Sequence, residues 1–94
     1  ENMKVYVVIE CGHYNLNDLE CNALGVHTSL EKAKKEMLDC HNNMISSVET
    51  LWDYNDNATI ISQEVDEMEC TLLYQTGGYL ERHFVFIEER EVEE

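Results

Sequence analysis

The chain has 94 residues, which is enough for one hydrophobic core. Its hydrophobic content of 44%, with 28% charged residues and no proline, excludes an intrinsically disordered chain. Twenty acidic residues against six basic ones give a net charge of −14, which argues against direct binding to nucleic acid or to an anionic membrane. We therefore expect one acidic domain spanning residues 1–94.

The first segment of the chain is typical of a β-strand. Residues Lys4 to Cys11 are rich in β-branched and aromatic side chains, and the run is too short for a core helix. Residues 12–22 contain Asn, Asp and Gly without periodicity, which predicts a loop. The apolar run from Ala23 to His27 then predicts a second strand.

A long helix is predicted next. Thr28 and Glu31 fit a capping box, in which Thr28 is the N-cap residue. The apolar residues that follow recur in steps of three and four and predict a helix from about Ser29 to Trp52. They are Leu30, Ala33, Met37, Cys40, Met44, Val48 and Leu51.

The last third of the chain predicts further strands. Residues 70–74 and 83–87 are short apolar runs, and Gly77 and Gly78 between them are typical of a hairpin turn. Residues 58–75 stay open between strand and part helix, because some of their apolar residues also fit helical spacing. The predicted class is α+β: an antiparallel sheet of four to five strands, in the order β-β-α-β-β, packed on one long helix.

The chain contains no run of 18 apolar residues and no basic segment followed by an apolar one near residue 1. The sequence therefore predicts neither a membrane span nor a signal peptide, and we expect the protein in the cytoplasm of a host cell. In that reducing compartment cysteines are more typical of thiols or metal ligands than of disulfides.

A zinc site is the metal centre that the cysteines and histidines favour. Cys11, His13 and Cys21 bracket the predicted loop. The first strand advances about 23 Å, and the helix returns about 18 Å by residue 41, so Cys40 and His41 should lie near that loop. Cys11, His13, Cys21 and Cys40 are the predicted zinc ligands, with His41 as the alternative fourth ligand.

Calcium is a weaker metal hypothesis. Asp53, Asn55, Asn57 and Glu64 stand at positions 1, 3, 5 and 12 of an EF-hand-like loop. Position 6 of that loop requires glycine for its sharp turn, and Ala58 occupies it here.

Two segments resemble the opening segments of small proteins encoded by phages and mobile elements. They are the strand Val5 to Glu10 (VYVVIE) and the strand, cap and helix start from Leu24 to Ala33 (LGVHTSLEKA). Small acidic proteins of this class include inhibitors of host defence of the anti-CRISPR and anti-restriction type. Some of these inhibitors occupy the nucleic-acid channels of nucleases, which implies a similar role here. The resemblance carries no functional residue over to this chain.

The predicted function is that of an inhibitory binding protein, not of an enzyme. A domain with a net charge of −14 complements a basic groove, so we expect it to dock on a nucleic-acid-binding surface, such as that of a Cas nuclease, and to block DNA loading. Glu88, Glu89 and Glu91 are the predicted partner-binding residues. A zinc-stabilised interaction module with an unrelated partner is one alternative. A thiol-dependent enzyme that uses Cys11 and His13 is another, but no third residue that would orient the pair is identifiable.

Overall fold

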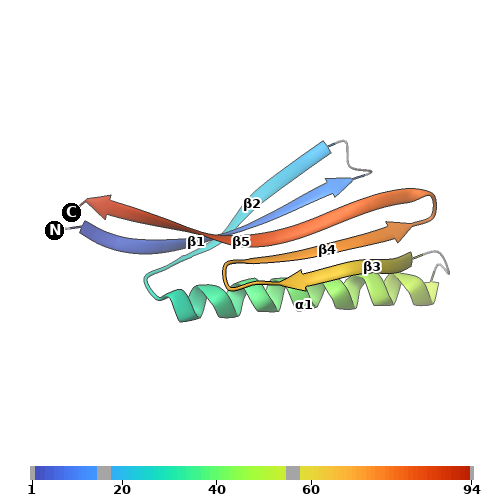
Figure 1. The fold of residues 1–94 in the computed structure, drawn as a ribbon, viewed down its shortest axis with the longest axis horizontal. Helices are drawn as coiled ribbons and strands as arrows, with labels where there is room; N and C mark the ends of the chain where they lie inside the picture. The colour runs from blue at the N-terminus through green and yellow to red at the C-terminus, as the bar shows by residue number, and fades with distance from the viewer. Residues whose placement is uncertain (1, 15–17, 55–57, 94) are drawn as a thin grey trace.

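The computed structural model describes residues 2–14, 18–54 and 58–93, which form five strands and one helix (Figure 1). In chain order these elements are β1 (Asn2–Tyr14), β2 (Asp18–His27), α1 (Leu30–Tyr54), β3 (Ala58–Val65), β4 (Glu69–Thr76) and β5 (Tyr79–Glu93). The molecule is elongated, with extents of 54 × 24 × 18 Å.

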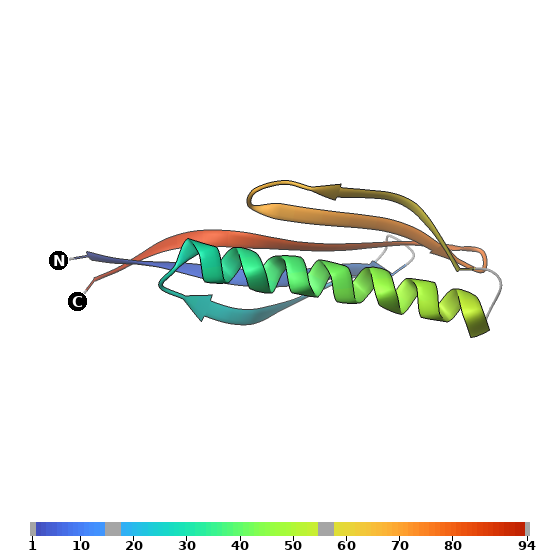
Figure 2. The ribbon, with the colours of Figure 1, turned by 90° about the horizontal axis from the view of Figure 1, so that it is seen from below.

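All five strands belong to one antiparallel sheet in the order β2-β1-β5-β4-β3. The last strand of the chain, β5, therefore lies at the centre, between β1 and β4. β2 and β3 are the two edges, and α1 connects them across one face of the sheet (Figure 2). The final segment of the chain thus joins the N-terminal hairpin to β4 and β3.

The predicted α+β class with the order β-β-α-β-β is wrong. The protein is mostly β, and its order is β-β-α-β-β-β, with three strands after α1 instead of two. The sheet is not built on one long helix, because the paired ends of β1 and β5 near the two termini extend beyond the start of α1 (Figure 1).

The missed strands lie in polar segments whose pairing depends on distant residues. The predicted loop at 12–22 is mostly strand, because β1 continues to Tyr14 and pairs with β2 from Asp18 onward. The ambiguous residues 58–75 form β3 and β4. The acidic end of β5 pairs with the start of β1, where Lys4 forms an ion pair with Glu89.

The helix and the last hairpin follow the sequence closely. α1 begins at Leu30, but its N-cap is Ser29 and not Thr28: the Lys32 amide donates to Ser29 Oγ at 3.4 Å, and the Ala33 amide donates to the Ser29 carbonyl at 3.1 Å. The predicted hairpin between β4 and β5 is confirmed, and its first turn residue, Gly77, has a φ of 59° that glycine adopts without strain.

The core lies between α1 and the sheet in two apolar clusters. Ala33 and Met37 belong to the first, which lies against the start of α1; its other buried members are Val8, Cys70, Val85 and Ile87. Val48 belongs to the second, further along α1, together with Ala58, Leu72 and Tyr74. The predicted apolar stripe therefore faces the sheet, and residues 40 and 41 lie between its two clusters. α1 lacks the apolar character that a membrane-spanning helix needs.

Candidate functional site

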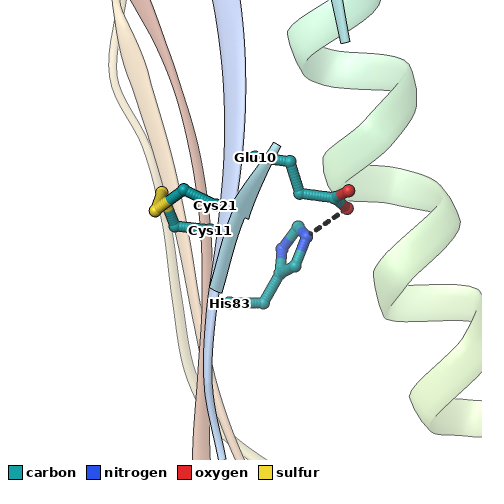
Figure 3. Close-up of a disulfide and its surroundings, with 4 residues drawn as sticks. All are labelled: Glu10, Cys11, Cys21 and His83. Carbon is teal, nitrogen blue, oxygen red and sulfur yellow. Dashed lines mark hydrogen bonds and ion pairs between the residues drawn. A yellow bond between two sulfur atoms is a disulfide. The ribbon is translucent and has the colours of Figure 1, made fainter. Parts of the chain in front are cut away.

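The sheet has one face covered by α1 and one open face. Successive side chains of a strand point to opposite faces, and Val8 packs against α1, so Val7, Ile9 and Cys11 lie on the other side of β1. Figure 3 shows the same alternation one step on, with Glu10 directed toward α1 and Cys11 directed away from it. α1 is the one described element outside the sheet, so none is left to cover the open face.

Two of the predicted zinc ligands form a disulfide on the open face. Cys11 and Cys21 are directly opposite in the β1–β2 ladder and are bonded to each other (Figure 3). The expectation that the cysteines are thiols or metal ligands is therefore wrong for this pair. It holds for Cys40 and Cys70, which are free thiols.

The other predicted ligands do not join that pair in one site. His13 shares the open face with Cys11, and its ring lies 6.1 Å from the ring of Phe84. Cys40 lies on α1, on the far side of the sheet, where its thiol contacts Glu10. The predicted ligand set fails because β1 directs adjacent residues to opposite faces, while the sequence estimate considered only distance along the chain.

The residues of the calcium hypothesis are placed only in part. Asn55 and Asn57 lie outside the described residues. Ala58 is the first residue of β3, and Glu64 is an exposed residue of the same strand. Positions 6 to 12 of the supposed EF-hand loop are therefore an extended strand, not a calcium-binding loop.

The open face has an apolar centre. Phe84 and Phe86 of β5 stack with ring centroids 6.2 Å apart, and Val7 and Ile9 of β1 lie beside them. The Cys11–Cys21 disulfide continues the apolar surface toward β2. The four apolar side chains are each partly exposed, although they occupy the middle strands of the sheet.

Carboxylates border this apolar centre on one side. Directly opposite residues share a face, and in consecutive rows Val7 lies opposite Glu88, Phe86 opposite Glu69, and Thr71 opposite Glu64. The three glutamates therefore follow one margin of the face, from β5 across β4 to β3. Glu64 and Glu69 are exposed and form no ion pair among the described residues, whereas Glu88 accepts a hydrogen bond from Arg90 at 2.9 Å.

The three predicted partner-binding acids do not share this margin. Glu88 lies on the open face, and its neighbours Glu89 and Glu91 alternate to the opposite side of β5. Glu89 is also partly neutralised by Lys4, whose Nζ lies 3.4 Å from Glu89 Oε1. Glu88 and Glu89 each contact a basic side chain, whereas Glu64 and Glu69 form no ion pair among the described residues, although Arg82 lines the same hollow as these two acids.

A partly buried polar cluster lies on the covered face, between the sheet and α1. Glu10 Oε2 lies 2.7 Å from His83 Nε2 and accepts a hydrogen bond from the Cys40 thiol at 3.2 Å. These three residues come from β1, β5 and α1. His41, the residue after Cys40, is 1% exposed, and both of its ring nitrogens lack a partner, as does Nδ1 of His83.

The environment of this cluster shifts the pKa values of its groups. The hydrogen bond from His83 lowers the pKa of Glu10 below its usual value, against the opposing effect of burial. Burial and the neighbouring Glu10 carboxylate raise the pKa of the Cys40 thiol to about 12. Burial, with a smaller contribution from His83, lowers the pKa of His41. The cluster therefore holds an ionised carboxylate and a protonated thiol.

Solvent reaches the cluster from two sides. Glu10 and Cys40 line a groove of about 720 Å³ between β2 and α1, where His27 also binds Glu36 at 3.0 Å. Glu10 and His83 line a smaller cavity of about 130 Å³ on the other side. Glu10 is thus the member that both openings share.

Sequence reasoning missed Glu10 and His83 as site residues, and it named Cys40 and His41 only as candidate ligands of a different set. A signal for the first two was present: Glu10 shares the phase of Val8 in β1, and His83 shares the phase of Val85 and Ile87 in β5. Every second residue of a strand lies on the same face, so Glu10 and His83 are expected on the buried face with these apolar residues. Polar residues on a buried face need hydrogen-bond partners, which identifies both as candidate site residues.

The family comparison adds a classification without a function. A domain of unknown function (DUF7336) matches residues 3–76, and the chain belongs to this family. The matched range includes α1 and the first four strands, with Glu10 and Cys40, and ends before β5 and His83. No curated protein matches the chain, and no solved structure does.

Proposed function

We propose that the domain is a binding protein that docks its open sheet face on a basic, nucleic-acid-binding surface of a partner protein and blocks nucleic-acid loading. The observation that carries this proposal is the combination of an apolar centre and an acidic margin on one uncovered face. Protein interfaces have this composition, with an apolar core inside a polar rim. A Cas nuclease is the partner that the resemblance to inhibitors of host defence suggests.

The charge of the domain favours a basic partner over a second copy of the chain. Two copies would each bring a net charge of −14, so their association is opposed by electrostatic repulsion. A basic surface instead neutralises Glu64, Glu69 and Glu88 while the phenylalanine rings bury apolar area. The same charge accelerates encounter with a basic groove at low salt, so association should slow as the ionic strength rises.

Paired charge reversals test the docking face. Glu64→Lys with Glu69→Lys changes the margin of the open face, and Glu31→Lys with Glu49→Lys makes the same change in net charge on exposed positions of α1. Both double variants and the wild-type domain are used to capture proteins from a lysate. A partner of the open face is retained by wild type and by the α1 variant and is lost by the margin variant.

Displacement of DNA tests the inhibitory step. The captured partner is purified and loaded with a fluorescent DNA duplex, and its anisotropy is followed as the domain is added. We expect wild type and the α1 variant to release the duplex and the margin variant to leave it bound. A partner that binds both double variants equally, or that holds the domain and the duplex together, would contradict the proposal.

A further inference from the structure

Three potential metal ligands converge in the polar cluster between α1 and the sheet. Glu10, Cys40 and His83 each direct one donor atom into the same space, and the three atoms lie within 4.8 Å of one another. Figure 3 shows Glu10 and His83 directed toward each other on the side of α1, away from the disulfide. This group is distinct from the open face on which the docking proposal rests.

We propose that Glu10, Cys40 and His83 form a zinc site. In a tetrahedral site with metal–ligand distances of about 2.0–2.3 Å, neighbouring donor atoms are about 3.3–3.8 Å apart. Glu10 Oε2 now lies 2.7 Å from His83 Nε2 and 3.2 Å from Cys40 Sγ. The two donor pairs that include Glu10 therefore need to separate by less than about 1 Å. The Cys40–His83 pair, which lies within 4.8 Å, needs to close by at most about 1.5 Å, a shift within the reach of side-chain rotation.

The chemistry of the three donors suits a borderline metal ion. Zinc accepts thiolate sulfur, imidazole nitrogen and carboxylate oxygen, whereas magnesium and calcium prefer oxygen ligands. Binding replaces the thiol proton of Cys40, which passes to the solvent, and it requires His83 to carry its ring proton on Nδ1, so that Nε2 gives up its hydrogen bond to Glu10 and coordinates the ion. The thiolate and the Glu10 carboxylate then balance the two positive charges of the ion, so a partly buried site becomes neutral.

His41 follows Cys40 in α1 but does not belong to the group of three donors. It is almost fully buried and makes no hydrogen bond through either ring nitrogen, so the proposed site uses Glu10, Cys40 and His83 alone. Three protein ligands leave a fourth zinc position open, and the groove beside Glu10 and Cys40 provides an entry path for the ion.

Cobalt spectroscopy tests the site directly. The full chain, without a histidine tag and with its disulfide intact, is freed of metal by a chelator and titrated with Co²⁺ and then Zn²⁺. We expect one equivalent of Co²⁺, with a thiolate-to-cobalt charge-transfer band and tetrahedral d–d absorption that Zn²⁺ abolishes. Cys40→Ser should remove the charge-transfer band, and Cys70→Ser, which changes the other free thiol, should keep it.

Further variants separate this site from the ligand set that the sequence predicted. Glu10→Gln and His83→Gln should weaken Zn²⁺ binding by more than about 100-fold, beyond the effect of losing a group that merely supports a ligand. Cys21→Ser and His13→Gln should leave it unchanged. Circular dichroism of the metal-free variants confirms folding, and Glu10→Gln carries the test if His83→Gln does not fold.

Three results would overturn the proposal. They are the absence of saturable Co²⁺ binding to the wild-type chain, a charge-transfer band that persists in Cys40→Ser, and Zn²⁺ binding that is lost in His13→Gln while Glu10→Gln retains it. The last result would instead favour a site that includes His13, as the sequence predicted.

Discussion

The Cys11–Cys21 disulfide should contribute measurably to the stability of the domain. The two cysteines are 10 residues apart. Closing a loop of that length removes unfolded-state entropy equivalent to about 2.7 kcal/mol at 25 °C. Because a domain of this size loses roughly 4–8 °C of melting temperature per kcal/mol, reduction should lower the melting temperature by roughly 10–20 °C.

Cys21→Ser is the variant that isolates this contribution. Cys21 is exposed, so replacing it with serine removes the disulfide without burying a hydroxyl group. Cys11 is only 2% exposed, so it is left unchanged. Unfolding by urea is measured for wild type and Cys21→Ser, each with and without a reducing agent. We expect the reduced wild type to match Cys21→Ser, and the reducing agent to have no further effect on the variant.

A wild-type midpoint that does not respond to the reducing agent would refute this reasoning, provided that mass spectrometry shows the bond to be broken. Detection of four free thiols in protein purified under air would refute it at an earlier step. Treatment with a chelator offers a contrast: it should not affect Cys11 and Cys21, since the structure joins them to each other and not to a metal.

The core, the buried histidine and the free thiols provide three more predictions. Met37→Ala should destabilise the domain by about 3 kcal/mol in urea unfolding because Met37 is 1% exposed, whereas Leu38→Ala on the exposed side of α1 should cost under about 1 kcal/mol; equal effects would contradict the orientation of α1. Burial lowers the pKa of His41 below 6.5 in the native state. As the pH falls below 6.5, the unfolded state therefore binds a proton that the native state does not bind, and the metal-free protein should lose stability. The loss should be smaller in the His41→Asn variant. An identical pH dependence of unfolding in both proteins would exclude His41 as the source. Burial raises the pKa of Cys40 to about 12 and also raises that of Cys70, so iodoacetamide at pH 8 should modify both thiols slowly in the native state and quickly in urea; rapid native modification of Cys40 would show that Glu10 and α1 do not shield it.

Local pattern was enough to predict the helix, its buried stripe and the last hairpin. Ala33, Met37 and Val48 recur with helical spacing, and all three are buried. An amphipathic pattern of this kind predicts a helix whatever the order of the strands that it packs against. Gly77 and Gly78 favour a tight turn through their own backbone freedom. These features depend on residues that are close in the sequence, so they could be predicted without the tertiary structure.

The sheet order, the disulfide and the polar cluster were decided by tertiary structure. Glu10, Cys40 and His83 are up to 73 residues apart and meet because β5 inserts beside β1 while α1 crosses the same face. Cys11 and Cys21 pair because β1 and β2 continue through a segment whose composition predicts a loop. Strand pairing links residues without regard to their separation in the sequence, and a shift of one residue moves a side chain to the other face. Composition therefore determined that the domain is acidic, whereas the register of β1 determined which of its residues face α1 and which face solvent.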